Sequence, residues 1–211
     1  MDGNGESLAR YTLRKRERLT RRKQFTHLDI RRKNQHYKKT MGKRSNFERK
    51  PRDFYPTPKA AVIPLIPHLP KTGLFSEPCA GDGSLIKHIE ELSNLHCYMA
   101  IDIEPRRDDI GHGDVLSVDV SGCDLTITNP PWDRKILHST ILQLSKQTPT
   151  WLLFDSDWMH TKQSIPYMDI CHKIVSVGRI KWFGNMTGKD NCSWYLFDKE
   201  TNTTIFVGRR Q

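Results

Sequence analysis

Short apolar runs alternate with amphipathic stretches over residues 60–211. An apolar run bounded by turn residues predicts a buried strand, whereas apolar positions three or four residues apart predict a helix that covers a sheet. The expected strands are 74–77, 98–103, 125–128, 151–154, 173–177, 194–197 and 204–207, and the expected helices are 59–66, 84–93 and 134–146.

This alternation predicts a doubly wound α/β fold with a mostly parallel, seven-stranded sheet that is covered on both faces. The last two apolar runs are joined by a polar stretch around residues 198–202. We therefore expect them to form an antiparallel hairpin at the edge of the sheet.

Charge divides the chain into two parts. Residues 1–52 hold 18 basic and 5 acidic residues, while the rest of the chain holds 16 basic and 19 acidic residues. The whole formal charge of +10 therefore comes from the first quarter of the chain. We expect a flexible or helical basic arm over residues 1–52 and one globular domain over residues 53–211.

A one-signed basic arm is typical of nucleic-acid binding, because Lys and Arg neutralise phosphates. The alternative is a solubilising tail without a partner. The basic and aromatic residues of the late segment 179–191 also suit nucleic acid, although this segment could equally be a polar loop. The candidate nucleic-acid contacts are Arg14, Arg21, Arg22, Arg31, Arg32, Lys181 and Lys189.

Five cysteines occur without a Cys-x-x-Cys pair or a spacing to His that indicates zinc. We therefore expect the cysteines to be reduced thiols and the chain to hold no metal site. The N-terminus lacks the apolar segment of a signal peptide, and no run approaches the roughly 18 apolar residues of a membrane span. These features predict a soluble cytoplasmic protein. They do not predict its oligomeric state.

The first chemical motif follows the first expected strand. Gly81 and Gly83 allow the backbone a positive φ and a close approach to a ligand at the start of a helix. Asp102 closes the next strand about 20 residues later, where a carboxylate can accept both ribose hydroxyls. Asp114 lies on a loop beside the same crevice and could accept from an adenine amino group. The alternative is a tight turn without a ligand.

The second motif is Asn129-Pro130-Pro131-Trp132, which follows the strand expected at 125–128. Two prolines stiffen the turn and remove two backbone donors, which leaves carbonyl acceptors. Asn129 adds a side-chain acceptor, and Trp132 offers a flat face for stacking. Acceptors beside an aromatic ring suit a planar substrate that carries an NH2 group.

In this order the motifs resemble the class I S-adenosylmethionine-dependent methyltransferases that act on amino groups. The resemblance covers residues 53–211. The order of the motifs, with the cofactor motifs before the catalytic loop, resembles the gamma arrangement of small phage-type adenine-N6 DNA methyltransferases. It implies a Rossmann-like fold, S-adenosylmethionine as cofactor, and catalysis by Asn129, Pro130, Pro131 and Trp132. The segment 55–58 resembles the motif that holds the methionine end of the cofactor. The implied cofactor-binding residues are Tyr55, Thr57, Glu77, Cys79, Ala80, Gly81, Gly83, Asp102, Ile103, Asp114, Val115 and Asn129.

The function expected from these features is methyl transfer to the exocyclic amino group of adenine in DNA, with or without sequence specificity. A base in RNA or a protein glutamine presents a similar planar amine, so both remain alternatives. A third alternative is a non-catalytic protein that binds nucleic acid and keeps the fold.

Overall fold

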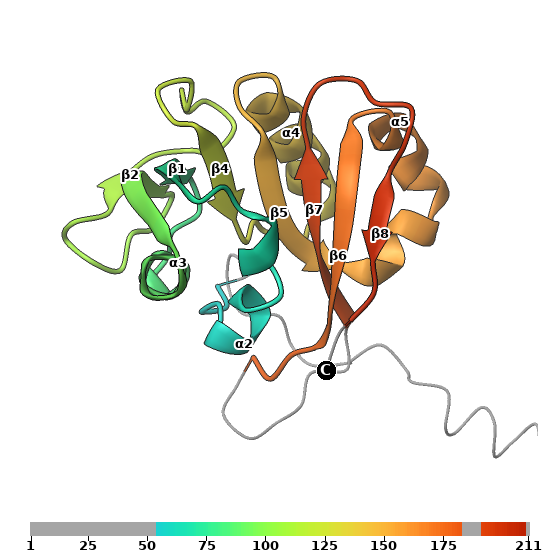
Figure 1. The fold of residues 1–211 in the computed structure, drawn as a ribbon. Helices are drawn as coiled ribbons and strands as arrows, with labels where there is room; N and C mark the ends of the chain where they lie inside the picture. Colours follow the sequence, from blue (N-terminus) through green and yellow to red (C-terminus); the bar gives the residue numbers. More distant parts are fainter. Residues whose placement is uncertain (1–53, 183–190, 210–211) are drawn as a thin grey trace, which may run out of the picture. The chain divides into compact units, whose positions relative to one another are not determined.

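The computed structural model describes residues 54–182 and 191–209, which lie in the second of the two units into which the chain divides, Arg44–Gln211. Its centre is an eight-stranded sheet in the order β3-β2-β1-β4-β5-β7-β6-β8 (Figure 1). The strands are β1 (Thr72–Glu77), β2 (Asn94–Asp102), β3 (Gly111–His112), β4 (Leu125–Thr128), β5 (Thr150–Asp155), β6 (Cys171–Arg179), β7 (Asn191–Phe197) and β8 (Ile205–Val207).

Helices lie on both faces of this sheet (Figure 1). The helices α2 and α3 pack with one hydrophobic cluster, and α4 packs with a second cluster together with η3 and residues of α5. The α-helices are α2 (Lys59–Val62), α3 (Ser84–Leu92), α4 (Arg134–Ser145) and α5 (Ile165–Met168), and the 3-10 helices are η2 (Ile66–His68), η3 (Ser156–His160) and η4 (Lys162–Ser164).

The two clusters arise from the alternation of side chains along the central strands. In β5, Trp151 and Leu153 face the α2–α3 side, whereas Leu152 and Phe154 face the α4 side, and all four are buried. A strand buried on both faces shows a continuous apolar run. This is why the sequence pattern located the central strands well.

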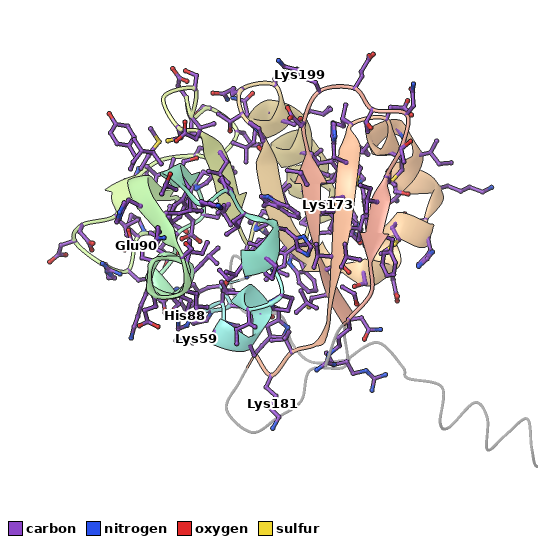
Figure 2. All side chains as sticks on the ribbon, in the orientation of Figure 1. Lys59, His88, Glu90, Lys173, Lys181 and Lys199 are labelled. Atoms are coloured by element: carbon purple, nitrogen blue, oxygen red, sulfur yellow. The ribbon has the colours of Figure 1, made fainter. Side chains whose placement is uncertain are left out.

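Side-chain contacts hold the short helix α2 on the sheet. The indole Nε1 of Trp194 in β7 donates to the carbonyl oxygen of Ala61 at 2.8 Å, in a buried position. At the surface, Lys59 lies 2.9 Å from Glu91 of α3, and Figure 2 shows Lys59 near His88, which also reaches Glu91. Residue 54 and its neighbours, which lead into α2, are thereby held next to β1 and α3.

The predicted doubly wound α/β class is confirmed, and each expected strand overlaps an observed one. The two-residue strand β3 is the addition that brings the sheet to eight strands. The expected hairpin of the last two strands is wrong in its pairing. Antiparallel β7 lies between β5 and β6, and β8 pairs with β6 in parallel.

Burial explains the corrected pairing. The apolar residues of β7 are buried on both faces, so its backbone N–H and C=O groups cannot reach water. They need hydrogen-bond partners on both sides, and β5 and β6 provide them. By contrast, Ile205 and Phe206 of β8 are exposed, as suits a strand at the edge.

Candidate active site

The predicted motifs meet at one edge of the sheet because β2, β1 and β4 are adjacent and parallel, so their carboxyl ends lie together. A cavity of about 590 Å³ opens there, which is a typical size for a small-molecule site. Its lining comes mainly from the segments 54–57, 77–82, 102–104 and 114–116, together with Asn129, Pro131 and Asp133 of the loop after β4.

The glycine turn between β1 and α3 contributes to the wall of the cavity. Gly81 and Gly83 adopt φ values of 53° and 73°, in the left-handed region that side chains other than glycine rarely adopt. A Cβ atom on Gly81 would lie 2.9 Å from the ring of Phe54. Gly81 lines the cavity, whereas Gly83 shapes the turn without lining it.

Asp102 joins this turn to the end of β2. Its Oδ2 accepts from the backbone N–H of Gly81 at 2.8 Å, and its Oδ1 accepts from the N–H of Glu104 at 2.7 Å. Each carboxylate oxygen can accept more than one hydrogen bond, so Asp102 keeps capacity for a ligand while its position is set.

Glu77 is the most unusual group of the site. It is buried, it lines the cavity, and its Oε2 has no hydrogen-bond partner among the described residues. Burial raises the pKa of its carboxyl well above the ordinary value, and the nearby Asp102 and Asp82 raise it further. An orphaned buried oxygen in a cavity wall suits a donor, above all a cation, supplied by a ligand.

Asn129 has its amide held on both sides. Its Nδ2 donates to Oγ1 of Thr57 at 3.1 Å and to the carbonyl oxygen of Tyr55 at 3.4 Å, while its Oδ1 accepts from the indole Nε1 of Trp132 at 3.3 Å. Because an indole N–H can only donate and a carbonyl can only accept, these contacts leave the amide one orientation. The Oδ1 retains a lone pair for a further donor.

Of the four residues predicted to be catalytic, Asn129 and Pro131 line the cavity, whereas buried Pro130 and half-buried Trp132 are not part of its lining. The indole of Trp132 also donates to the carbonyl oxygen of Leu153 at 3.2 Å. Its ring meets the ring of Trp182 edge-on, with the centroids 5.9 Å apart.

The other predicted cofactor residues surround the same cavity. Tyr55, Thr57, Cys79 and Ala80 line it from the segments before α2 and after β1, and Ile103, Asp114 and Val115 line it from the segments after β2 and β3. The loop is held by Oδ1 of Asp114, which accepts from the N–H of Leu116. Burial raises the pKa of the Cys79 thiol above its ordinary value, so this group is a neutral wall rather than a nucleophile.

Sequence reasoning missed several residues of the lining. Leu116 and Ile136 expose apolar side chains at the cavity, as Ile103 does, and together they offer a surface for a flat ring. Leu116 directly follows the Gly-Asp-Val stretch, a signal that could have located it. Phe54 and Arg106 lie outside every motif and carried no such signal.

The predicted nucleic-acid contacts are mostly outside the described residues. This holds for Arg14, Arg21, Arg22, Arg31, Arg32 and Lys189. Lys181 is described and exposed, and it follows β6 at the same edge of the sheet as the cavity (Figure 2). Trp182 is the next residue in the sequence. Trp182 reaches the site, since its ring lies edge-on to Tyr55 with a centroid distance of 6.1 Å.

The charge of the cavity is strongly negative. Its described lining includes six carboxylic acids and, among Lys and Arg, Arg106 alone. Such a lining attracts cations and repels anions. The six acids are Glu77, Asp82, Asp102, Glu104, Asp114 and Asp133.

Neither a protein-family model nor a curated protein sequence matches the chain. A candidate RNA methyltransferase from Pyrococcus horikoshii is similar in structure, with a TM-score of 0.54, 13% identity, and coverage of 75% of this chain and 95% of that one. A dimethyladenosine transferase from Plasmodium falciparum gives a TM-score of 0.47 at 14% identity, over 71% of this chain and 65% of that one. A candidate class I S-adenosylmethionine-dependent methyltransferase from Listeria monocytogenes gives a TM-score of 0.46 at 11% identity, over 71% of this chain and 62% of that one.

This chain therefore spans less than two thirds of the Plasmodium and Listeria structures. The likeness to the Pyrococcus structure shows a shared Rossmann-like fold. Within the residues that the structure describes, no helix has the length and apolar character needed to cross a membrane.

Proposed function

We propose that this protein is an S-adenosylmethionine-dependent methyltransferase that methylates the exocyclic amino group of adenine in DNA. The observation that carries the proposal is the continuity of two features. An acidic cavity with the orphaned Oε2 of Glu77 runs directly into a proline-stiffened turn whose acceptor, Asn129, is held in one orientation.

The residues of the cavity fit this cofactor. At neutral pH it carries a sulfonium, an ammonium and one carboxylate, so a lining rich in carboxylates favours it. Glu77 would accept from the ammonium, and Asp102 from the ribose hydroxyls. Ile103, Leu116 and Ile136 would flank the adenine ring, with Asp114 near its amino group.

The bound cofactor would supply a methyl group activated by its positive sulfur. The amino nitrogen of adenine is a weak nucleophile because its lone pair is delocalised into the ring. Oδ1 of Asn129 and the carbonyl of Pro130 would accept its hydrogens and turn the lone pair toward the methyl carbon. The nitrogen–carbon bond would form as the carbon–sulfur bond breaks, and the methylated nitrogen would release one proton to water. Placement in line supplies much of the acceleration, so no strong base is required.

The rings of Tyr55 and Trp132 both contact the ring of Trp182, and Asn129 hydrogen-bonds to the Tyr55 backbone and the Trp132 indole. These three aromatic side chains would provide the surface on which the target base rests. A base in duplex DNA must leave its stack to reach this point. Stacking on aromatic side chains is worth about 1–3 kcal/mol per base, which offsets a large part of that cost. Lys181 and the basic residues 1–52 would contact phosphates.

The test is transfer of a radiolabelled methyl group from S-adenosylmethionine to duplex DNA, total RNA and a protein lysate, each assayed separately. We expect label on adenine in DNA, whereas label on RNA or on glutamine would select one of the alternative substrates. Asn129→Ala should abolish transfer and leave cofactor binding nearly intact.

Asn94→Ala is the matched control, because Asn94 is exposed at the opposite, amino-terminal end of β2. Full activity of Asn129→Ala, or an absence of cofactor binding by the wild-type protein, would refute the proposal.

A further inference from the structure

Arg106 stands out in the cavity because its charge is opposite to that of its surroundings. It is the one Lys or Arg among the described residues of the lining, which otherwise carries acids. It belongs to no motif and lies in the loop between β2 and β3. A cation in an acidic cavity is either a solvated neutraliser of its neighbours or a partner for an anion.

The structure holds this side chain in a defined place. The backbone N–H of Arg106 donates to the carbonyl oxygen of Gly81 at 3.0 Å, which fastens the loop to the glycine turn. The guanidinium carbon lies 3.8 Å from the centre of the Phe54 ring, a cation–π contact. Phe54 in turn rests on Gly81, where a Cβ atom would approach it to 2.9 Å.

These contacts place the guanidinium on Phe54 and its loop on the glycine turn. Phe54 begins the segment 54–57, whose Tyr55 and Thr57 hydrogen-bond to Asn129. Asp114 and Leu116 line the cavity from the segment that follows β3, on the other side of β2. Arg106 therefore lies against the glycine turn and the segment 54–57, while Ile103 of the proposed adenine surface lies earlier in the same loop.

The acidic partner of Arg106 leaves its donors available. Glu104 lies 3.6 Å from one guanidinium nitrogen, which is an ion pair longer than a hydrogen bond, and both side chains are exposed. A guanidinium has five N–H donors in a planar fork that matches a carboxylate. A ligand carboxylate can thus form shorter, bidentate contacts.

We infer that Arg106 binds the α-carboxylate of the cofactor and thereby makes the site selective for an amino-acid-bearing nucleoside. The inference rests on the proposed function. The carboxylate is the single anionic group of S-adenosylmethionine, and the ionised acids of the lining would repel it. Arg106 is the described side chain of the cavity that can offset this repulsion.

The experiment compares two ligands that differ in this group alone. S-adenosylmethionine and its decarboxylated analogue share the adenosine, the sulfonium and the amine. Their dissociation constants would be measured by titration calorimetry with wild-type protein, Arg106→Gln and Arg106→Lys. The charge-matched control is Lys87→Gln, an exposed position on α3 that does not line the cavity.

We expect Arg106→Gln to weaken S-adenosylmethionine about ten- to a hundredfold, as loss of a charged hydrogen-bonded pair does, and to leave the decarboxylated analogue within about twofold. The affinity of Arg106→Lys for S-adenosylmethionine should lie between those of the wild type and Arg106→Gln, because an ammonium keeps the charge but lacks the planar pair of donors. Lys87→Gln should match the wild type for both ligands.

Two results would overturn the inference while the proposed function stands. Equal weakening of both ligands would show that Arg106 acts only by packing Phe54 on the glycine turn. Unchanged affinity for both ligands, with a raised KM for DNA, would show that Arg106 contacts the polymer. Wild-type protein that binds neither ligand would instead refute the proposed function, and the inference with it.

Discussion

At the scale of one residue, the burial of Glu77 links the stability of the fold to pH. Its buried carboxyl has a raised pKa and an oxygen without a partner among the described residues. Above the ordinary pKa of 4.5 the unfolded chain ionises at this position, while the folded chain retains the proton to higher pH. Glu77 therefore lowers stability progressively as pH rises between these two pKa values.

Glu77→Gln removes this titration and keeps the shape of the side chain. We expect its Tm at pH 7 to exceed that of the wild type, by about 2–4 °C for each kcal/mol relieved, and the difference to vanish below pH 4.5. Affinity for S-adenosylmethionine should fall about tenfold or more, because an amide attracts the ammonium less. Thermal unfolding across pH and calorimetric titration measure the two effects.

The control for this change is Glu200→Gln, which removes an exposed carboxyl in the loop between β7 and β8 and should alter neither quantity. A lower Tm of Glu77→Gln at pH 7 would contradict the argument, since it would show that the ionised carboxylate stabilises the folded chain.

At the scale of elements, the site depends on how the β1–α3 turn meets the segment before α2. Phe54 covers Gly81, Arg106 stacks on Phe54, and Thr57 holds Asn129 after β4. One glycine thus links the turn between β1 and α3 to the loop proposed for catalysis. A side chain at this position would disturb several walls of the cavity together.

Gly81→Ala tests this link. An alanine in the left-handed region costs about 1–2 kcal/mol, and its methyl group would displace Phe54. We expect Tm to fall by a few degrees and affinity for S-adenosylmethionine to fall at least tenfold. Gly122→Ala is the control, because a Cβ atom there would lie 4.0 Å from the ring of Tyr98, an ordinary van der Waals distance. Equal behaviour of the two variants would show that the Phe54 contact does not matter.

At the scale of the whole molecule, the excess of basic residues is concentrated in residues 1–52, before the α/β fold. Removal of residues 1–50 takes away most of this charge and leaves the segment 54–57 in place. We expect weaker binding to DNA and a flatter fall of affinity with salt, since the slope scales with the number of phosphates neutralised. Affinity for S-adenosylmethionine should not change.

Fluorescence anisotropy with labelled DNA over a range of salt concentrations measures this slope, and calorimetry measures the cofactor. A truncated chain that keeps the salt slope of the full protein would show that residues 1–50 do not contact DNA.

Much of this organisation could be read from the sequence because its signals are local. The expected strand at 125–128 is β4 itself, and the strand at 74–77 lies within β1. Both are buried runs that end in turn-forming residues. Because parallel strands end at the same edge of a sheet, the motifs that follow β1, β2 and β4 lie together, and the cavity joins Gly81, Asp102 and Asn129.

The sequence by itself determined the α/β class, the order of the motifs and the charge asymmetry, because periodicity, turn chemistry and charge depend on neighbours along the chain. Tertiary structure alone decided that β7 enters between β5 and β6, that the Trp132 indole orients Asn129, and that Arg106 joins an acidic cavity. These features depend on which distant surfaces pack together. Burial and hydrogen-bond satisfaction over the whole fold select that packing, and no short stretch of sequence contains it.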